Sequence, residues 1–334
     1  MGVFHSHERC ETLPGNSRLR VATRERRNSG DRPRWLILCD GILYVLGGLT
    51  VCGAEEMTRE ELRKPLDIRA PGSDLANFPN SAFTLPQGGF YLELSPFTYA
   101  TRSQTLAAQY NFEYLLRYGL FDWMELRLYS QGFSVQGNPQ PAVGFSPLTF
   151  DTKIHFWNEF EDYYLPAAGL EVLLQTTLLG SPAFDSGTEP SFSLNFDQTL
   201  AWGLALEYNL GAARFEDPED VSRSVWDVTF AWAIQKEVVE DVAVFLNGYY
   251  NAANLPRVGR LSDTSVVACP SPAPCRAEEL MRRRVMGGNE SQHAIGVGGL
   301  WTLNDHVALF VNLAGGLTAP TPSFTSFVGL AWTP

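Results

Sequence analysis

The chain has 334 residues, of which 45% are hydrophobic and 19% are charged, and it carries 21 Phe, 12 Tyr and 8 Trp. This composition excludes a disordered chain, and a content of only 5 Cys excludes a small disulfide-dense scaffold. Lys and Arg number 25 against 37 Asp and Glu, which gives a formal net charge of −12 at pH 7. So acidic a chain is not suited to nucleic acid as a partner.

Residues 1–54 have the layout of an export signal with a long basic n-region. Arg residues dominate positions 18–34, and an apolar run follows over residues 35–53. A basic start stays in the cytoplasm while the apolar run enters the translocon, and small residues at its end offer a cleavage site. We therefore predict a mature chain that begins near Glu55. An uncleaved anchor helix is one alternative, because the run approaches the ~20 residues that span a bilayer. Lipid attachment at Cys52 is another.

An alternation of apolar and polar residues begins after a stretch punctuated by Pro, which we interpret as an irregular periplasmic lead-in over residues 55–86. Between Gln109 and Tyr118 every second residue is apolar, and its neighbours are mostly polar. An extended chain places these two sets on opposite faces, whereas a helix would scatter both. The pattern recurs to the C-terminus, so residues 87–334 are predicted to be all-β.

The alternating segments predict about 12 strands, an even number that suits a closed antiparallel up-and-down barrel with both termini on one side. A soluble β-sandwich also alternates, but its strands average about 5–6 residues. Segments of about 10 residues match tilted strands that cross a membrane. Aromatic residues near the ends of the apolar rows, such as Tyr110 and Trp332, fit interfacial girdles. We predict a transmembrane β-barrel with the apolar row facing lipid and the polar row facing the lumen. The segments lie at 90–97, 109–118, 124–129, 150–156, 170–178, 192–196, 204–210, 226–234, 242–250, 293–301, 307–314 and 324–332.

The links between these segments alternate in length. Gly119–Asp122 and Thr302–Asp305 are short, whereas Gln136–Ser146, Phe215–Ser222 and Asn251–Glu290 are longer and richer in Gly, Pro and Asp. Outer-membrane barrels show this asymmetry between periplasmic turns and surface loops. The longer links are therefore predicted to be surface loops.

Several stretches are similar to a known family. The most specific is LLRYGLFDWMELRL at Leu115–Leu128, and others are Phe83–Tyr99, Ala201–Gly211 and the C-terminal GGLWTLNDHVALFVNLAGGL. Over residues 83–332 the chain resembles the outer-membrane transporters labelled "meta-pathway of phenol degradation". The resemblance implies an outer-membrane β-barrel of a Gram-negative bacterium with a role in passing small, often aromatic, molecules. It brings no set of functional residues.

These observations lead us to expect a porin-like channel or transporter for the passive passage of small molecules. A structural or adhesive barrel with a plugged lumen and functional surface loops is the alternative. The expected partners are outer-membrane lipid and lipopolysaccharide, a small-molecule solute and the barrel-assembly machinery. The sequence contains no HExxH, GxSxG or P-loop motif and no metal-spaced Cys/His set, so we expect no enzyme, no cofactor and no metal site.

The inward row of the predicted barrel carries most of its charged groups. Such a row forms either a polar conduit or a plugged lumen in which acids and bases pair. Acidic residues outnumber basic ones, so a water-filled lumen is expected to prefer cations and neutral solutes. The predicted lumen-lining residues are Glu93, Glu113, Arg117, Glu125, Arg127, Asp151, Lys153, His155, Glu171, Asp197, Glu207 and Asp227.

The longest predicted loop holds two further features. Cys269 and Cys275 lie close together in an exported chain, and we predict that they form a disulfide, with two free thiols as the alternative. Arg276 and Arg282–Arg284 form a basic cluster downstream. This cluster could bind lipopolysaccharide or an anionic solute, or it could belong to a solvated loop.

Overall fold

The computed structural model describes residues 66–334 apart from 104–106, 139–140, 161–163, 186, 218–219 and 251–291. For residues 215–217, 220–225 and 227 it describes the backbone alone. The predicted export signal 1–54, the start of the predicted lead-in, the pair Cys269 and Cys275 and the downstream Arg cluster all lie outside the described residues.

The described chain is built from antiparallel strands, with one short 3₁₀ turn. No helix in this part of the chain is long and apolar enough to cross a membrane. In chain order the elements are β1 (Phe90–Ala100), β2 (Gln109–Phe121), β3 (Met124–Gln136), β4 (Ala142–Phe145), β5 (Thr149–Trp157), β6 (Ala167–Gln175), β7 (Glu189–Leu200), η3 (Ala201–Gly203), β8 (Leu204–Asp217), β9 (Asp220–Val239), β10 (Val242–Tyr250), β11 (His293–Asn304), β12 (Val307–Gly316) and β13 (Thr325–Trp332).

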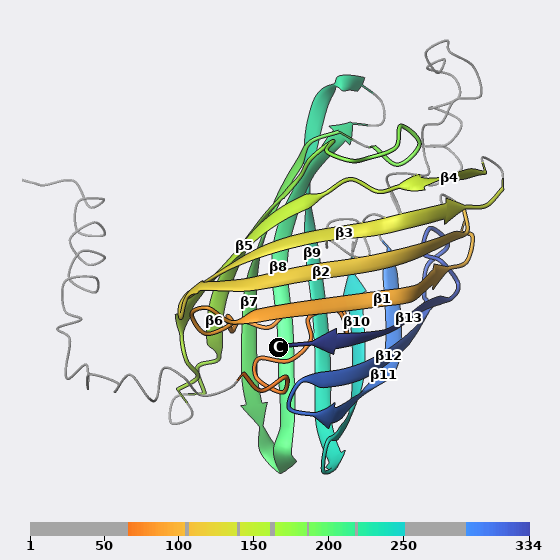
Figure 1. Ribbon diagram of the computed structural model, residues 1–334. Helices are drawn as coiled ribbons and strands as arrows, with labels where there is room; N and C mark the ends of the chain where they lie inside the picture. Colours follow the sequence, from red (N-terminus) through yellow and green to blue (C-terminus); the bar gives the residue numbers. More distant parts are fainter. Residues whose placement is uncertain are drawn as a thin grey trace, which may run out of the picture. The chain divides into compact units, whose positions relative to one another are not determined.

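The strands close into a barrel (Figure 1). The ring closes where β1 pairs with β13, with Leu92 opposite Trp332. β4 pairs with the end of β3, over Phe133–Gln136, and β5 pairs with its beginning, over Met124–Tyr129. β4 and β5 therefore share one position in the wall, which has twelve strands. The predicted fold, an up-and-down barrel of about this size, is confirmed.

The barrel is apolar outside and polar inside. On β3, the side chain of Leu126 is 40% exposed, whereas Glu125 and Arg127 on either side of it are buried. The same inversion occurs on β12, where Val311 is exposed and Asn312 is buried. An apolar outer surface on a closed hydrogen-bonded ring is what hydrocarbon requires, because no backbone group is left unpaired there.

Two predicted loops differ from the structure. We predicted a loop at Phe215–Ser222, but β8 and β9 continue pairing until Asp217 lies opposite Asp220. The link predicted at Gln136–Ser146 contains β4, which forms because β3 still has free backbone groups beyond the start of β5. In both places the backbone hydrogen bonds between strands continue beyond the residues in which apolar and polar side chains alternate. The loops were predicted from the end of that alternation.

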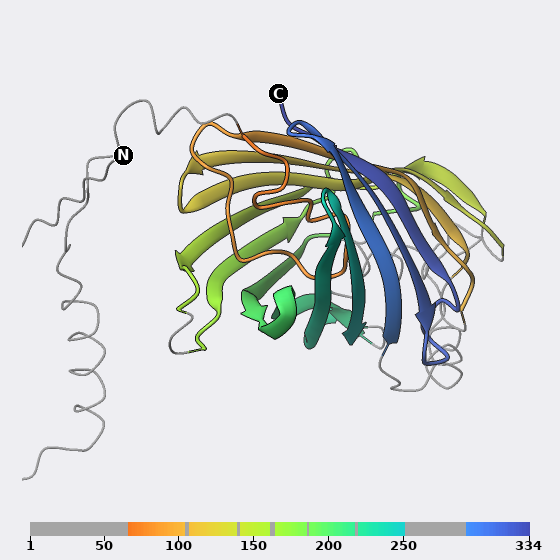
Figure 2. The ribbon, with the colours of Figure 1, turned by 90° about the horizontal axis from the view of Figure 1, so that it is seen from below.

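The described residues before β1, 66–89, lie inside the barrel. Figure 2 shows this irregular stretch, drawn in orange, within the ring of strands. We predicted residues 55–86 to be a periplasmic lead-in. The described part is irregular and lies in the lumen, where its polar groups pair with the charged wall.

Candidate functional site

Residues 66–89, here called the inner segment, enter the barrel at the rim that carries the short turns. There the guanidinium of Arg69 pairs with Asp241 (2.5 Å) in the β9–β10 turn and with Asp305 (2.8 Å) in the β11–β12 turn. These groups are solvent-exposed, so each ion pair contributes little to stability. They nevertheless fix where the segment begins.

Two wall glycines allow the inner segment to lie directly against the strands. A Cβ atom on Gly119 of β2 would overlap the carbonyl oxygens of Leu85 and Pro86. A Cβ on Gly169 of β6 would come within 2.7 Å of the carbonyl oxygen of Ala82. The sequence uses glycine at these two positions because no side chain fits between the wall and the segment.

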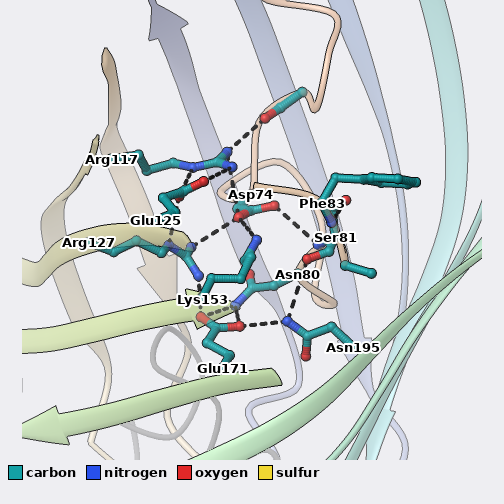
Figure 3. Close-up of polar contacts among 12 residues, drawn as sticks. Asp74, Asn80, Ser81, Phe83, Arg117, Glu125, Arg127, Lys153, Glu171 and Asn195 are labelled. Carbon is teal, nitrogen blue, oxygen red and sulfur yellow. Dashed lines mark hydrogen bonds and ion pairs between the residues drawn. The ribbon is translucent and has the colours of Figure 1, made fainter. Parts of the chain in front are cut away.

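Asp74 is the centre of the polar contacts between the segment and the wall (Figure 3). Its Oδ2 lies 2.6 Å from Nζ of Lys153, 3.1 Å from Nη2 of Arg127 and 3.5 Å from Nη1 of Arg117. The backbone N–H of Ser81 donates to its other oxygen at 3.2 Å. Burial alone would raise the pKa of the Asp74 carboxyl, but the three cations outweigh burial and hold that pKa well below its usual value.

The strand register brings the wall charges together. Glu125 of β3 lies opposite Lys153 of β5, and Lys153 lies opposite Glu171 of β6. Two residues further along β3, at the next inward-facing position, Arg127 lies opposite Asp151. Side chains directly opposite on neighbouring strands are within contact distance, so the alternation along each strand produces a ladder of opposite charges.

Arg117 of β2 is fully buried among acceptors from three parts of the chain. Its Nε donates to Glu125 (2.6 Å), and its Nη1 donates to Glu93 of β1 (3.0 Å) and to the carbonyl oxygen of Gly72 (2.8 Å). The guanidinium also lies 5.5 Å from the centre of the Tyr91 ring. A buried guanidinium is tolerated only with this density of partners.

Arg127 and Lys153 differ in how many carboxylates they contact. Arg127 pairs with Asp151 (3.0 Å) and with Glu171, in addition to Asp74. Among the described residues, Asp74 is the one carboxylate within ion-pair distance of Lys153. We call the eight residues of this network the charge cluster, whose members are Asp74, Glu93, Arg117, Glu125, Arg127, Asp151, Lys153 and Glu171.

Asn80 provides a second attachment of the inner segment to the wall. Its Nδ2 donates to both oxygens of Glu171 at 2.8 Å (Figure 3). Its backbone N–H donates to Oδ1 of Asn209 on β8 at 2.6 Å, and Nδ2 of Asn209 donates back to the carbonyl oxygen of Asn80 at 2.8 Å. The amide side chain of Asn209 thus pairs with the segment backbone as a neighbouring strand would.

Asp197 on β7 and Glu207 on β8 lie opposite each other and also bind the segment. Asp197 accepts from the hydroxyl of Ser81 (3.1 Å) and from the backbone N–H of Ala82. Glu207 accepts from Nδ2 of Asn77 at 2.9 Å. The two carboxylates therefore receive hydrogen bonds from the segment.

Apolar contacts attach the segment to the opposite wall. The ring of Phe78 meets Tyr249 of β10 edge to face at 4.8 Å and lies 5.9 Å from Phe327 of β13. Leu75 belongs to a cluster with Leu115 on β2 and other buried side chains. The segment therefore crosses the lumen, with polar contacts from β1 to β8 and aromatic contacts on β10 and β13.

The structure places the predicted lumen residues in several environments. Seven of the twelve are in the charge cluster, and Asp197 and Glu207 accept hydrogen bonds from segment residues between Asn77 and Ala82. Glu113 is buried on β2. The ring of His155 lies 3.0 Å from the carbonyl oxygen of Ala82 and stacks on Phe83. Asp227 lies on β9, and its side chain is outside the described part of the chain.

Sequence reasoning missed the segment residues that complete this site, namely Asp74, Asn77, Asn80 and Ser81. The lead-in has no periodicity that would place it on a wall or in a core. The available signal was indirect, because Arg117, Arg127 and Lys153 on three successive inward rows require buried anionic partners. The second indication was the high content of Asn, Ser and Asp at positions 73–81, which can supply such polar partners.

A closed barrel with an apolar exterior and a charged interior defines an outer-membrane β-barrel protein. The sequence model of the family described as "Putative MetA-pathway of phenol degradation" matches residues 73–266, and the chain belongs to this family. The match begins inside the inner segment, one residue before Asp74. No curated protein sequence matches the chain significantly.

Solved structures with a similar arrangement are outer-membrane proteins of low sequence identity. An outer membrane channel from Pseudomonas putida F1 is 14% identical, with a TM-score of 0.45, over 77% of this chain and 99% of that one. An anion-selective porin from Comamonas acidovorans is 9% identical, with a TM-score of 0.30, over 74% of this chain and 98% of that one.

Proposed function

We propose that the protein is an outer-membrane channel for small molecules and that the inner segment is its gate. The observation that carries this proposal is the way in which the lumen is filled. The segment crosses the lumen as a separate strip of chain, and side-chain contacts hold it to a wall that is polar in its own right.

The polar lining extends beyond the segment's own contacts. The buried amides of Asn247 on β10 and Asn312 on β12 bond to each other, with Nδ2 of Asn247 donating at 3.2 Å. Eight-stranded barrels fill their interior with side chains, whereas barrels of about 16–18 strands leave a channel. A twelve-stranded wall is wide enough to hold a segment of chain, and withdrawal of that segment leaves a polar passage.

The family label supports small aromatic molecules as the first solutes to test. Acidic residues outnumber basic ones on the inward face, which supports a preference for small inorganic cations over chloride in the open state. Both points concern what passes through the channel. The gating role depends on the contacts of the inner segment with the wall.

The test is single-channel recording of the folded full-length protein in planar lipid bilayers. We expect discrete openings separated by long closed periods. Asn80→Ala removes the side-chain bonds to Glu171 and should lengthen the open periods. Asn138→Ala in the exposed link between β3 and β4 is the matched control and should behave as the unsubstituted protein does. Absence of conductance from both the unsubstituted protein and Asn80→Ala would refute the channel.

The second candidate is a structural barrel whose lumen stays closed. The extent of the segment's contacts favours it, because they reach β1, β2, β3, β5, β6, β7 and β8 as well as β10 and β13. The two candidates differ in the recording just described. A structural barrel gives no openings in any folded variant, whereas a gated channel opens more often as contacts are removed.

A further inference from the structure

The position of Asp74 is a carboxylate-binding site built by the wall. Its Oδ2 receives Lys153 from β5, Arg127 from β3 and Arg117 from β2, at 2.6, 3.1 and 3.5 Å. All three cations are buried. Asp74 itself belongs to the inner segment, so the ligand of this site is carried by the gate.

Withdrawal of the segment would affect the three cations unequally. Arg117 keeps Glu93 and Glu125 as partners. Arg127 likewise keeps Asp151 and Glu171 on the wall. Lys153 would lose the one carboxylate that lies within ion-pair distance of it among the described residues. Once the segment withdraws, the Lys153 ammonium faces the open lumen without a carboxylate in contact, and it can accept one from a solute.

We propose that a small monocarboxylic acid anion binds beside Lys153 in place of Asp74 when the channel opens, and that this exchange promotes opening. The inference rests on the proposed gating by the inner segment. A solute that binds the open state in preference to the closed state shifts the equilibrium towards opening. Such a solute supplies the acceptor that the wall loses with Asp74.

Charge balance favours a monoanion over a dianion at this site. The closed charge cluster holds five carboxylates (Asp74, Glu93, Glu125, Asp151 and Glu171) and three cations. Replacing the Asp74 carboxylate with that of a solute leaves this balance unchanged. A phosphate dianion would bring one more negative charge into a cluster in which carboxylates already outnumber cations. Repulsion from these carboxylates raises the energy of the dianion there.

The proposed exchange is local and is compatible with an overall preference for cations. The acid excess of the whole lumen governs which ions move through an open passage. The site concerns one position, where three cationic groups already hold a carboxylate. That carboxylate stays ionised in the buried site, because the cations hold its pKa well below the usual value.

The experiment compares acetate with chloride in single-channel recordings at constant ionic strength and at pH 8.5, where inorganic phosphate is almost entirely a dianion. Acetate reproduces the side chain of Asp74, acetamide is its neutral isostere, and phosphate is the dianion. We expect acetate to raise the open fraction on the order of tenfold, which corresponds to one charge-assisted hydrogen bond. Acetamide and phosphate should leave the open fraction within about twofold of its value in chloride.

Two substitutions connect the response to this site. Lys153→Met should abolish the effect of acetate, and Lys153→Arg should retain it. Folding is checked by the heat-modifiable migration of the barrel on gels. If Lys153→Met does not fold, Asp74→Asn gives an independent reading, because its weakened gate should respond to about tenfold less acetate than the unsubstituted protein requires.

The outcomes separate this inference from the proposed function. Openings that are the same in acetate and chloride overturn the carboxylate site and leave the channel standing. An acetate effect that persists in Lys153→Met, or an equal effect of phosphate, also overturns it. A complete lack of conductance in the unsubstituted protein, Asp74→Asn and Asn80→Ala overturns the channel itself.

Discussion

Asn209 bonds the backbone of Asn80 in both directions, accepting from its N–H at 2.6 Å and donating to its carbonyl oxygen at 2.8 Å. A single side chain on β8 thereby satisfies both backbone groups of a residue in the middle of the lumen. Buried backbone groups that lose such partners are costly to leave unpaired. The bonds between Asn209 and Asn80 therefore contribute to holding the inner segment against the wall.

Asn209→Ala should loosen the inner segment while leaving the wall intact. Loss of two buried hydrogen bonds should destabilise the docked segment by about 2 kcal/mol. Hydrogen exchange followed by mass spectrometry should then show faster exchange in peptides that contain Asn80, with unchanged protection on β10 to β13. Asn138→Ala, in the exposed link between β3 and β4, is the control. Equal protection of the segment in both variants would contradict the role assigned to Asn209.

Phe78→Ala should release the segment without altering any charge. The substitution removes the ring that contacts Tyr249 and Phe327, and truncation of a buried Phe destabilises by about 3–5 kcal/mol. We expect longer open periods in bilayer recordings and faster exchange of the segment. Tyr249→Phe retains the aromatic contact and serves as the control. A Phe78→Ala protein that stays closed and protected would show that the polar contacts hold the segment alone.

Acidification should release the segment only at strongly acidic pH, as far as Asp74 is concerned. The pKa of Asp74 is lower in the folded protein than in the unfolded chain. Its contribution to stability is therefore fully present above the unfolded value, near 4, and is lost as the pH falls through the folded value. Segment protection at pH 5 should equal that at pH 7.

The comparison variant is Asp74→Asn, which lacks this acid-sensitive group. Its segment should be less protected at pH 7 and should lose less further protection between pH 4 and pH 2. The cations that face Asp74 are Arg117, Arg127 and Lys153. Release of the segment of the unsubstituted protein between pH 7 and pH 5 would show that other carboxylates, and not Asp74, determine its response to pH.

A charge on the outer surface should destabilise the barrel according to its depth. Val311, midway along β12, and Leu303, near the end of β11, are 40% and 46% exposed. An Arg at the bilayer midplane costs about 2–4 kcal/mol, whereas near the interface the cost falls to about 0–1 kcal/mol. Unfolding in lipid vesicles should therefore shift far more for Val311→Arg than for Leu303→Arg. Equal shifts would contradict the membrane-spanning orientation.

The alternation in the sequence was sufficient to predict the barrel, because the apolar residues of each strand mark the face that contacts lipid. Arg117 and Glu125 could be placed inside on that basis alone. Their partner Asp74 could not, because the lead-in has no repeating pattern and its position depends on contacts with strands far along the chain. The extra pairing at Asp217 and Asp220 escaped prediction for a related reason, since backbone bonding needs no apolar alternation.

The separations along the chain between the inner segment and its partners also constrain the order of folding. Asp74 is 79 residues before Lys153, and Asn80 is 129 residues before Asn209. Long-range contacts of this kind form late, since the intervening chain must first be ordered. The segment precedes the described strands, and yet its binding surface is incomplete until β8 is in place. Protection of Asn80 during refolding would therefore mark the moment at which this part of the barrel is assembled.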